Sequence, residues 1–147
     1  MADQERVHVK LGLSGTYWDK KPQYRVSIND QVLAQSSISA DSDVVEYVEF
    51  DVEYSTDTAT LKIELLGKEF SDCVQSEDKT EILKDMLLNI HSVEIDEISL
   101  GQIPFNHSEY FPDGRDDLIK NCLNLGWNGA WNLTWNNPFY LWLLEKM

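Results

Sequence analysis

The stretch YRVSINDQVL, residues 24–33, contains the pattern that decides the predicted fold. The even-numbered residues up to Ile28 are apolar and the odd-numbered residues between them are polar, as on a strand with one buried face. Asn29 and Asp30 then interrupt the run before further β-prone residues. Because an Asn-Asp pair between two such runs suits a tight turn, the stretch predicts two antiparallel strands joined as a hairpin.

The same alternation extends in both directions along the chain. It is present in residues 6–13, 44–54 and 61–65, and turn signals separate these runs about every ten residues. Residues 86–100 are apolar with a shift of phase, which predicts a bulge or two successive strands. Since no helical period competes in this part of the chain, we expect an all-β fold, an antiparallel β-sandwich of jelly-roll type.

The last third of the chain has a different pattern. Residues 102–114 contain two prolines and few apolar pairs, which predicts a loop, and residues 116–125 can form a short helix. Four of the five tryptophans lie between residues 127 and 142. Pro138 can occupy the first turn of a final helix over residues 139–146.

We therefore expect a single domain with two parts. Residues 1–103 form the sandwich, and residues 104–147 form an aromatic-rich extension packed on the sandwich or on a partner. The length of 147 residues agrees with one domain of ordinary size.

The charge balance excludes several classes of function. The chain has 26 acidic and 12 basic residues and a net charge of −14, so phosphate backbones and anionic lipid repel it. We expect no nucleic-acid partner and no membrane partner. The first residues, MADQERVHVK, lack the features of a signal peptide, and no apolar stretch is long enough to span a membrane. Two cysteines without metal-site spacing predict a reducing compartment.

Two stretches carry a resemblance to a known family. The hairpin at 24–33 and the run DMLLNIHSVEIDEISLG, residues 85–101, resemble the hairpin and the later apolar strand of calcium-dependent, xylan-type carbohydrate-binding modules. The resemblance covers about residues 6–103. Domains of this kind also occur in small structural proteins of tailed myophages, and the run PFYLWLLE at 138–145 is similar to their C-termini. The resemblance implies a sugar-binding sandwich carried on a phage particle.

The resemblance also implies a calcium site. Family members place an Asn-Asp pair after the strand equivalent to residues 61–66, where this chain has Gly67-Lys68. Asp85 is the ligand position that carries over, and Asp72 and Asp78 of the acidic loop are further candidates, because calcium takes six to eight oxygens. The alternative is a solvated acidic loop, since no EF-hand spacing is present. We expect no cofactor other than, at most, calcium.

Tyr17, Trp18 and Asp19 are the candidate sugar contacts. They lie in a loop between two predicted strands, where ring faces can stack on a pyranose and a carboxylate can bond hydroxyls. The alternative is that Trp18 covers the end of the core.

The aromatic residues near the C-terminus are candidates for docking to a partner. Large aromatic side chains are enriched in the buried anchors of interfaces, although burial in the chain's own core is the alternative. The candidates are Trp127, Trp131, Trp135, Phe139, Tyr140 and Trp142.

The sequence contains no recognisable catalytic motif, so we expect a protein that is not an enzyme. The first hypothesis is a phage virion structural or accessory protein that assembles in the host cytoplasm. It docks to other virion proteins or its own copies and contacts surface glycans. The alternative is a free, calcium-assisted carbohydrate-binding module, and the third hypothesis is a small glycan-processing enzyme.

Overall fold

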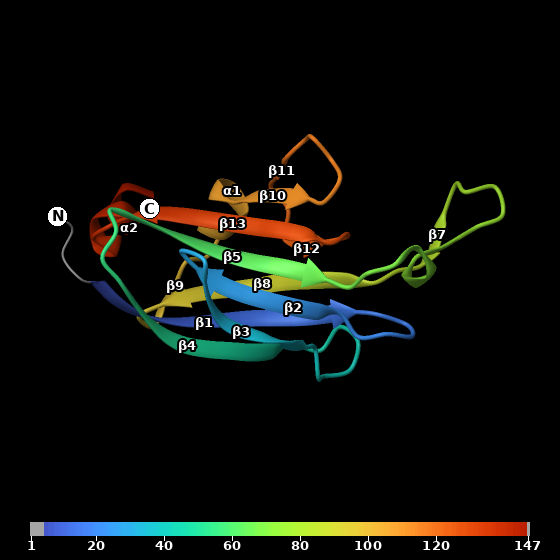
Figure 1. Cartoon of the computed structure of the whole chain (residues 1–147), viewed down its shortest axis with the longest axis horizontal. Coiled ribbons are helices and arrows are strands. Elements are labelled where there is room, and N and C mark those ends of the chain that lie inside the picture. The colour runs from blue at the N-terminus through green and yellow to red at the C-terminus, as the bar shows by residue number, and fades with distance from the viewer. Residues whose placement is uncertain (1–4, 147) are drawn as a thin grey trace.

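Two antiparallel sheets face each other in the computed structural model, which describes residues 5–146 (Figure 1). The side chains that point between the sheets are apolar, and those of Val9, Leu11, Leu61 and Ile63 are fully buried. The predicted antiparallel β-sandwich is therefore confirmed, and its core follows from the period of two in the sequence.

The first sheet has five strands. In order across the sheet they are β12 (Asn124–Leu125), β8 (Leu87–Ile95), β1 (Glu5–Thr16) and β4 (Glu46–Tyr54), with β9 (Ile98–Ser99) also paired to β8.

The second sheet has six strands. In order they are β11 (Ile119–Lys120), β10 (Glu109–Pro112), β13 (Gly129–Asn136), β5 (Thr58–Leu66), β2 (Gln23–Ile28) and β3 (Gln31–Ser37). The remaining elements are the 3-10 helix η1 (Phe70–Asp72), the small hairpin of β6 (Val74–Gln75) and β7 (Ile82–Lys84), and the helices α1 (Ile103–His107) and α2 (Phe139–Lys146).

The predicted hairpin is present as β2 and β3. Asn29 and Asp30 form its turn with φ angles of 50° and 66°, the left-handed region that Asn and Asp tolerate better than most residues. The side chain of Asn29 accepts a hydrogen bond from the Thr60 amide at 3.0 Å, which fixes the turn to β5.

The phase shift in residues 86–100 comes from both expected causes, a bulge and a division into two successive strands. Between β1 and β8, Gly12 pairs with Ser92 and Leu13 with Ile90, so His91 is an extra residue in β8. A turn at Asp96 and Glu97 then leads into the separate strand β9.

The prediction for residues 102–125 was wrong. The expected loop contains α1 and β10, and the expected helix is replaced by the two short strands β11 and β12. Pairing with distant strands decides this region: Tyr110 is opposite Ile119, and Leu125 is opposite Leu88 of β8. Residues 109–136 therefore supply strands to both sheets.

The final helix was predicted correctly, with α2 spanning Phe139–Lys146. No helix in the described range 5–146 is long and apolar enough to cross a membrane.

Most of the aromatic docking candidates are core residues. Trp131 and Trp135 of β13 are fully buried, and their indole N–H groups donate to the Cys122 carbonyl at 3.0 Å and to the Tyr54 hydroxyl at 3.1 Å. Phe139 and Trp142 are buried where α2 meets the sandwich. These four side chains stabilise the chain itself and are not available as anchors for a partner, which corrects that expectation.

Candidate functional site

Trp18 and Asp72, two candidates from the sequence, are in contact with each other. The β6–β7 hairpin, which begins two residues after Asp72, projects from the end of the sandwich opposite α2 (Figure 1). The Trp18 indole N–H donates to the Asp72 carbonyl at 2.9 Å, and the residue remains 43% exposed. The Lys84 ammonium lies 5.0 Å from the centre of this ring. We call this region the loop end; it comprises residues 17–20, 67–85 and 126–128.

Tyr17 and Asp19 flank Trp18 but are placed differently. Tyr17 turns toward the sandwich, where its hydroxyl donates to the Ala40 carbonyl at 2.9 Å, and Asp19 is exposed. Of the three predicted sugar contacts, Trp18 alone presents a large ring surface to solvent. Its exposure also argues against the alternative that it covers the core.

A second exposed ring at the loop end was missed by the sequence analysis. Phe70 of η1 is 87% exposed, and its ring lies 5.2 Å from that of the half-buried Trp127 at 34°. A single Phe in an acidic loop gives no periodic signal, so only the structure reveals that it adjoins an aromatic partner from a distant segment.

Lys68 is buried at the centre of the loop end. Its ammonium donates to Asp85 Oδ1 at 2.6 Å and to the Gly126 carbonyl at 2.6 Å, and the residue is only 5% exposed. The backbone of Lys68 forms two hydrogen bonds with the side chain of Asn128, at 2.8 and 2.9 Å. The chain therefore provides its own cation for Asp85.

The other two predicted metal ligands also have partners within the chain. The Asp72 carboxylate accepts from Lys20 at 2.9 Å and from the Glu69 amide at 2.8 Å. Burial pushes the pKa of Asp72 upward, but these two donors outweigh burial and hold it below its ordinary value.

Asp78 lies in the turn of the β6–β7 hairpin. The hydroxyls of Ser76 and Thr80 donate to its carboxylate at 2.6 and 2.7 Å and lower the pKa of Asp78 to about 2. Within residues 5–146, no three His, Cys, Asp or Glu side chains gather closely enough to hold a metal ion. The Asp85 carboxylate is also bonded to the Lys68 ammonium. The oxygen atoms of the loop end therefore do not fit a calcium site.

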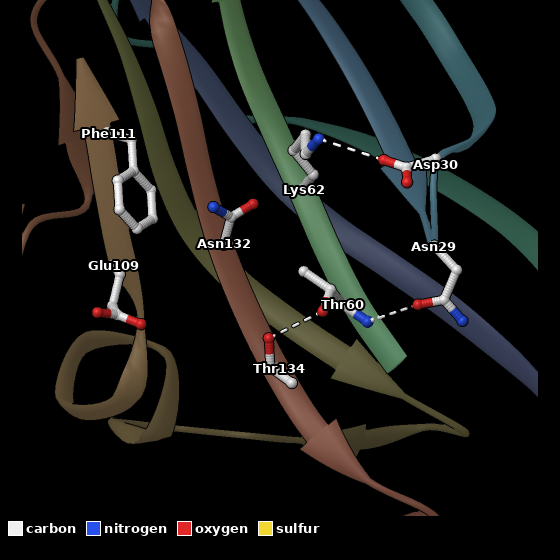
Figure 2. Close-up of a pocket in the computed structure, with 8 residues that line it drawn as sticks. All are labelled: Asn29, Asp30, Thr60, Lys62, Glu109, Phe111, Asn132 and Thr134. Atoms are coloured by element: carbon white, nitrogen blue, oxygen red, sulfur yellow. Dashed lines mark hydrogen bonds and ion pairs between the residues drawn. The ribbon is translucent and has the colours of Figure 1, made fainter. Parts of the chain in front are cut away.

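A second candidate surface lies on the outer face of the six-stranded sheet. It is a groove of about 410 Å³ that crosses β10, β13 and β5 and ends at the β2–β3 turn (Figure 2). We call it the sheet groove; it is lined by Asn29, Asp30, Thr60, Lys62, Glu109, Phe111, Asn132 and Thr134. The alternation that directs Trp131 and Leu133 into the core directs polar neighbours into this groove.

The groove side chains are only partly bonded to one another. The hydroxyls of Thr60 and Thr134 are 2.9 Å apart, and Lys62 Nζ lies 3.4 Å from the exposed carboxylate of Asp30. The Oδ1 atom of Asn132 is buried and has no hydrogen-bond partner. Phe111, a residue that is 43% exposed, supplies an aromatic ring.

The sequence analysis did not identify these groove residues. The alternation showed that residues 60, 62, 132 and 134 point away from the core. It did not show that β5 and β13 are neighbours, which requires pairing across about seventy residues.

One serine–histidine pair has the side chains of a hydrolase, but a substrate cannot reach it. Ser14 Oγ lies 2.7 Å from His91 Nε2, but Ser14 is 1% exposed and also accepts from Asn89 Nδ2 at 3.1 Å. A nucleophile must reach its substrate, so this buried Ser–His pair is part of the sheet packing.

The fold is similar to that of carbohydrate-binding modules. One solved structure, vCBM60 in complex with galactobiose, superposes with a TM-score of 0.55 at 6% identity, covering 86% of this chain and 96% of that chain. A second, the selenomethionine form of vCBM60, gives a TM-score of 0.54 at 8% identity, covering 86% of this chain and 89% of that chain. For that second protein, circular permutation provides an evolutionary link between two families of calcium-dependent carbohydrate-binding modules. No protein-family model and no curated protein matches the sequence.

Proposed function

We propose that this protein is a non-catalytic glycan-binding domain and that a sugar stacks on the exposed rings of the loop end. The observation that carries this proposal is the exposure of Trp18 and Phe70. Hydrogen bonds from Trp18 to Asp72 and from Lys68 to Gly126 hold the surrounding loops in place. An exposed aromatic ring is unfavourable in water, and contact with the apolar face of a pyranose removes that unfavourable exposure. The likeness of the fold to carbohydrate-binding modules supports the same conclusion.

The surroundings of the rings support recognition of hydroxyl groups. The Lys84 ammonium lies over the Trp18 ring, 5.0 Å from its centre, where it can donate to a sugar hydroxyl, and the exposed Asp19, next in the chain, provides an acceptor. The indole of Trp18 is oriented by the Asp72 carbonyl, which reduces the entropy lost when a ligand binds.

Binding at the loop end does not use calcium in this proposal. In calcium-assisted recognition, the ion contributes a positive charge that sugar hydroxyls can contact. Here the cation next to Asp85 is Lys68, which is buried and therefore out of a ligand's reach.

A glycan array tests the proposal, probed once with calcium and once with a chelator. We expect binding to a defined glycan in both conditions, and at least tenfold weaker binding by Trp18→Ala and Phe70→Ala. Tyr47→Ala is the matched control, because Tyr47 is a similarly exposed aromatic on β4, far from the rings in the chain. Binding that is absent in both conditions contradicts the proposal, and binding that requires calcium contradicts its calcium-free form.

A role in a phage particle is the second candidate function. Its supporting observation is the outer face of α2, where Tyr140, Leu141 and Leu144 are all more than half exposed. Tyr140 is the docking candidate from the sequence that stays accessible in this helix. Replacing Leu141 and Leu144 by Gln should abolish incorporation into particles and leave the fold intact. Unchanged incorporation contradicts this role for α2.

A further inference from the structure

The sheet groove has a rigid floor. Its strands are paired on both sides, with Asn132 of β13 opposite Glu109 of β10 and opposite Lys62 of β5. The ladder satisfies the backbone groups, so side chains alone are presented to a ligand. Sites built on paired strands hold their geometry more closely than sites on loops.

The chemistry of the groove selects a class of ligand. Two hydroxyls, two amides, an ammonium and two carboxylates provide donors and acceptors, and Phe111 provides the one exposed ring of the groove. Two carboxylates against one ammonium, on a chain of net charge −14, disfavour an anion. The polar lining disfavours an apolar ligand. A neutral molecule rich in hydroxyl groups satisfies both conditions.

Asn132 supplies the most specific feature. Figure 2 shows its amide nitrogen on the side of Phe111 and its Oδ1 on the side of Lys62. That Oδ1 is buried without a partner, which is a cost to the free chain. Lys62 is held only by a 3.4 Å contact with the exposed Asp30, and exposed ion pairs of this kind are weak. A ligand hydroxyl that reaches Oδ1 supplies the missing donor, and the weakly held Lys62 is available to the same ligand.

We propose that the sheet groove is a second binding site, separate from the loop end, for a short neutral oligosaccharide. One sugar stacks on Phe111, and the next is hydrogen-bonded by Asn132 and by the Thr60 and Thr134 hydroxyls. The volume of about 410 Å³ accommodates about two monosaccharide units and lies within the usual range for ligand sites.

Two-dimensional ¹H–¹⁵N NMR of the full chain tests this site directly. The probes are galactobiose, xylotetraose and cellotetraose, each at about 10 mM, which detects a Kd of about 1 mM or tighter. We expect at least one probe to shift the side-chain amide signals of Asn132 together with the backbone signals of Thr60 and Phe111. No shift at these signals with any probe overturns the proposal.

Two phenylalanines distinguish the two sites. Phe111→Ala should weaken the groove response at least tenfold and leave any response of the Trp18 indole unchanged, whereas Phe70→Ala should do the reverse. Phe111→Leu preserves most of the side-chain volume without the ring, so it separates lost stacking from lost folding. If Phe111→Leu binds as well as the wild type, the proposed stacking is wrong. If the groove responds and the loop end does not, the proposed function of the loop end fails while the groove proposal stands.

Discussion

The loop end and the sheet groove are both polar surfaces with exposed rings, but they differ in how their polar groups are satisfied. At the loop end, Asp72 and Asp85 are each bonded to a lysine of the same chain. In the groove, Asn132 Oδ1 has no partner and Lys62 is held at 3.4 Å. The loop end therefore uses its charges for its own stability and offers mainly ring surface to a ligand. The groove contains polar atoms that are free to bond a ligand.

The two regions also differ in their scaffold. The loop end is built from turns and short elements whose positions depend on side-chain contacts such as Lys68 with Gly126. The groove floor is positioned by continuous strand pairing. Substitutions of the bonded charged residues at the loop end should therefore affect stability, and substitutions of the polar residues in the groove should affect binding.

The largest effect is expected from Lys68→Met. It leaves the partly buried Asp85 carboxylate without its cation, which should lower the free energy of unfolding by about 3 kcal/mol. Urea denaturation measures the change. Lys120→Met is the control, an exposed lysine for which we expect a change within about 0.5 kcal/mol.

A double variant sharpens this result. Lys68→Met combined with Asp85→Leu removes both charges, so it should recover part of the stability that the single variant loses. If Lys68→Met alone is as stable as the wild type, the ion pair does not stabilise the loop end and the contrast with the groove is wrong.

Two asparagines provide the next largest effect. Asn132→Ala removes an unpartnered acceptor, so stability should stay constant or rise by up to about 1 kcal/mol. Asn89→Ala removes an amide that bonds Ser14 and Thr16, and it should cost about 1–3 kcal/mol. The same denaturation experiment compares the two variants. Equal losses in the free energy of unfolding would show that the Asn132 amide contributes to stability as much as the Asn89 amide does.

A smaller effect is expected from pH at the loop end. The pKa of Asp72 lies below its ordinary value of 3.8, so its contribution to stability is complete above that value and is lost as the pH falls through the lowered pKa. The Trp18 indole N–H, bonded to the Asp72 carbonyl, should report this transition by NMR.

Lys20→Met tests the cause of the lowered pKa. It removes the ammonium that holds the Asp72 carboxylate, so the transition should move to higher pH. An unchanged transition in this variant would assign the shift to the Glu69 amide alone.

No effect is expected from calcium on the wild type. Because Lys68 is bonded to Asp85, millimolar calcium or a chelator should change Tm by less than about 1 °C. Lys68→Asp should gain stability from calcium, since it places a second carboxylate beside Asp85 in place of the ammonium. A rise in Tm of the wild type with calcium would contradict our account of the loop end.

The structure confirms the parts of the fold that depend on local patterns. The hairpin at Asn29-Asp30, the bulge in β8 and the helix after Pro138 all come from neighbouring residues, so their signals lie within about ten positions. Residues 102–125 were predicted incorrectly because their strands exist only through pairing with distant partners. The candidate sites follow the same division. Trp18 stood out as an aromatic in a loop, whereas Phe70 and the groove residues did not.

The sequence by itself determined that the chain is a β-sandwich, because the period of two assigns each residue to the inner or outer face of its strand. It also determined the acidic character and the residues available as contacts. The tertiary structure alone decided which outer faces adjoin, which tryptophans are buried, and that Lys68 meets Asp85. These outcomes depend on contacts between segments far apart in the chain, and periodicity carries no information about which strands become neighbours.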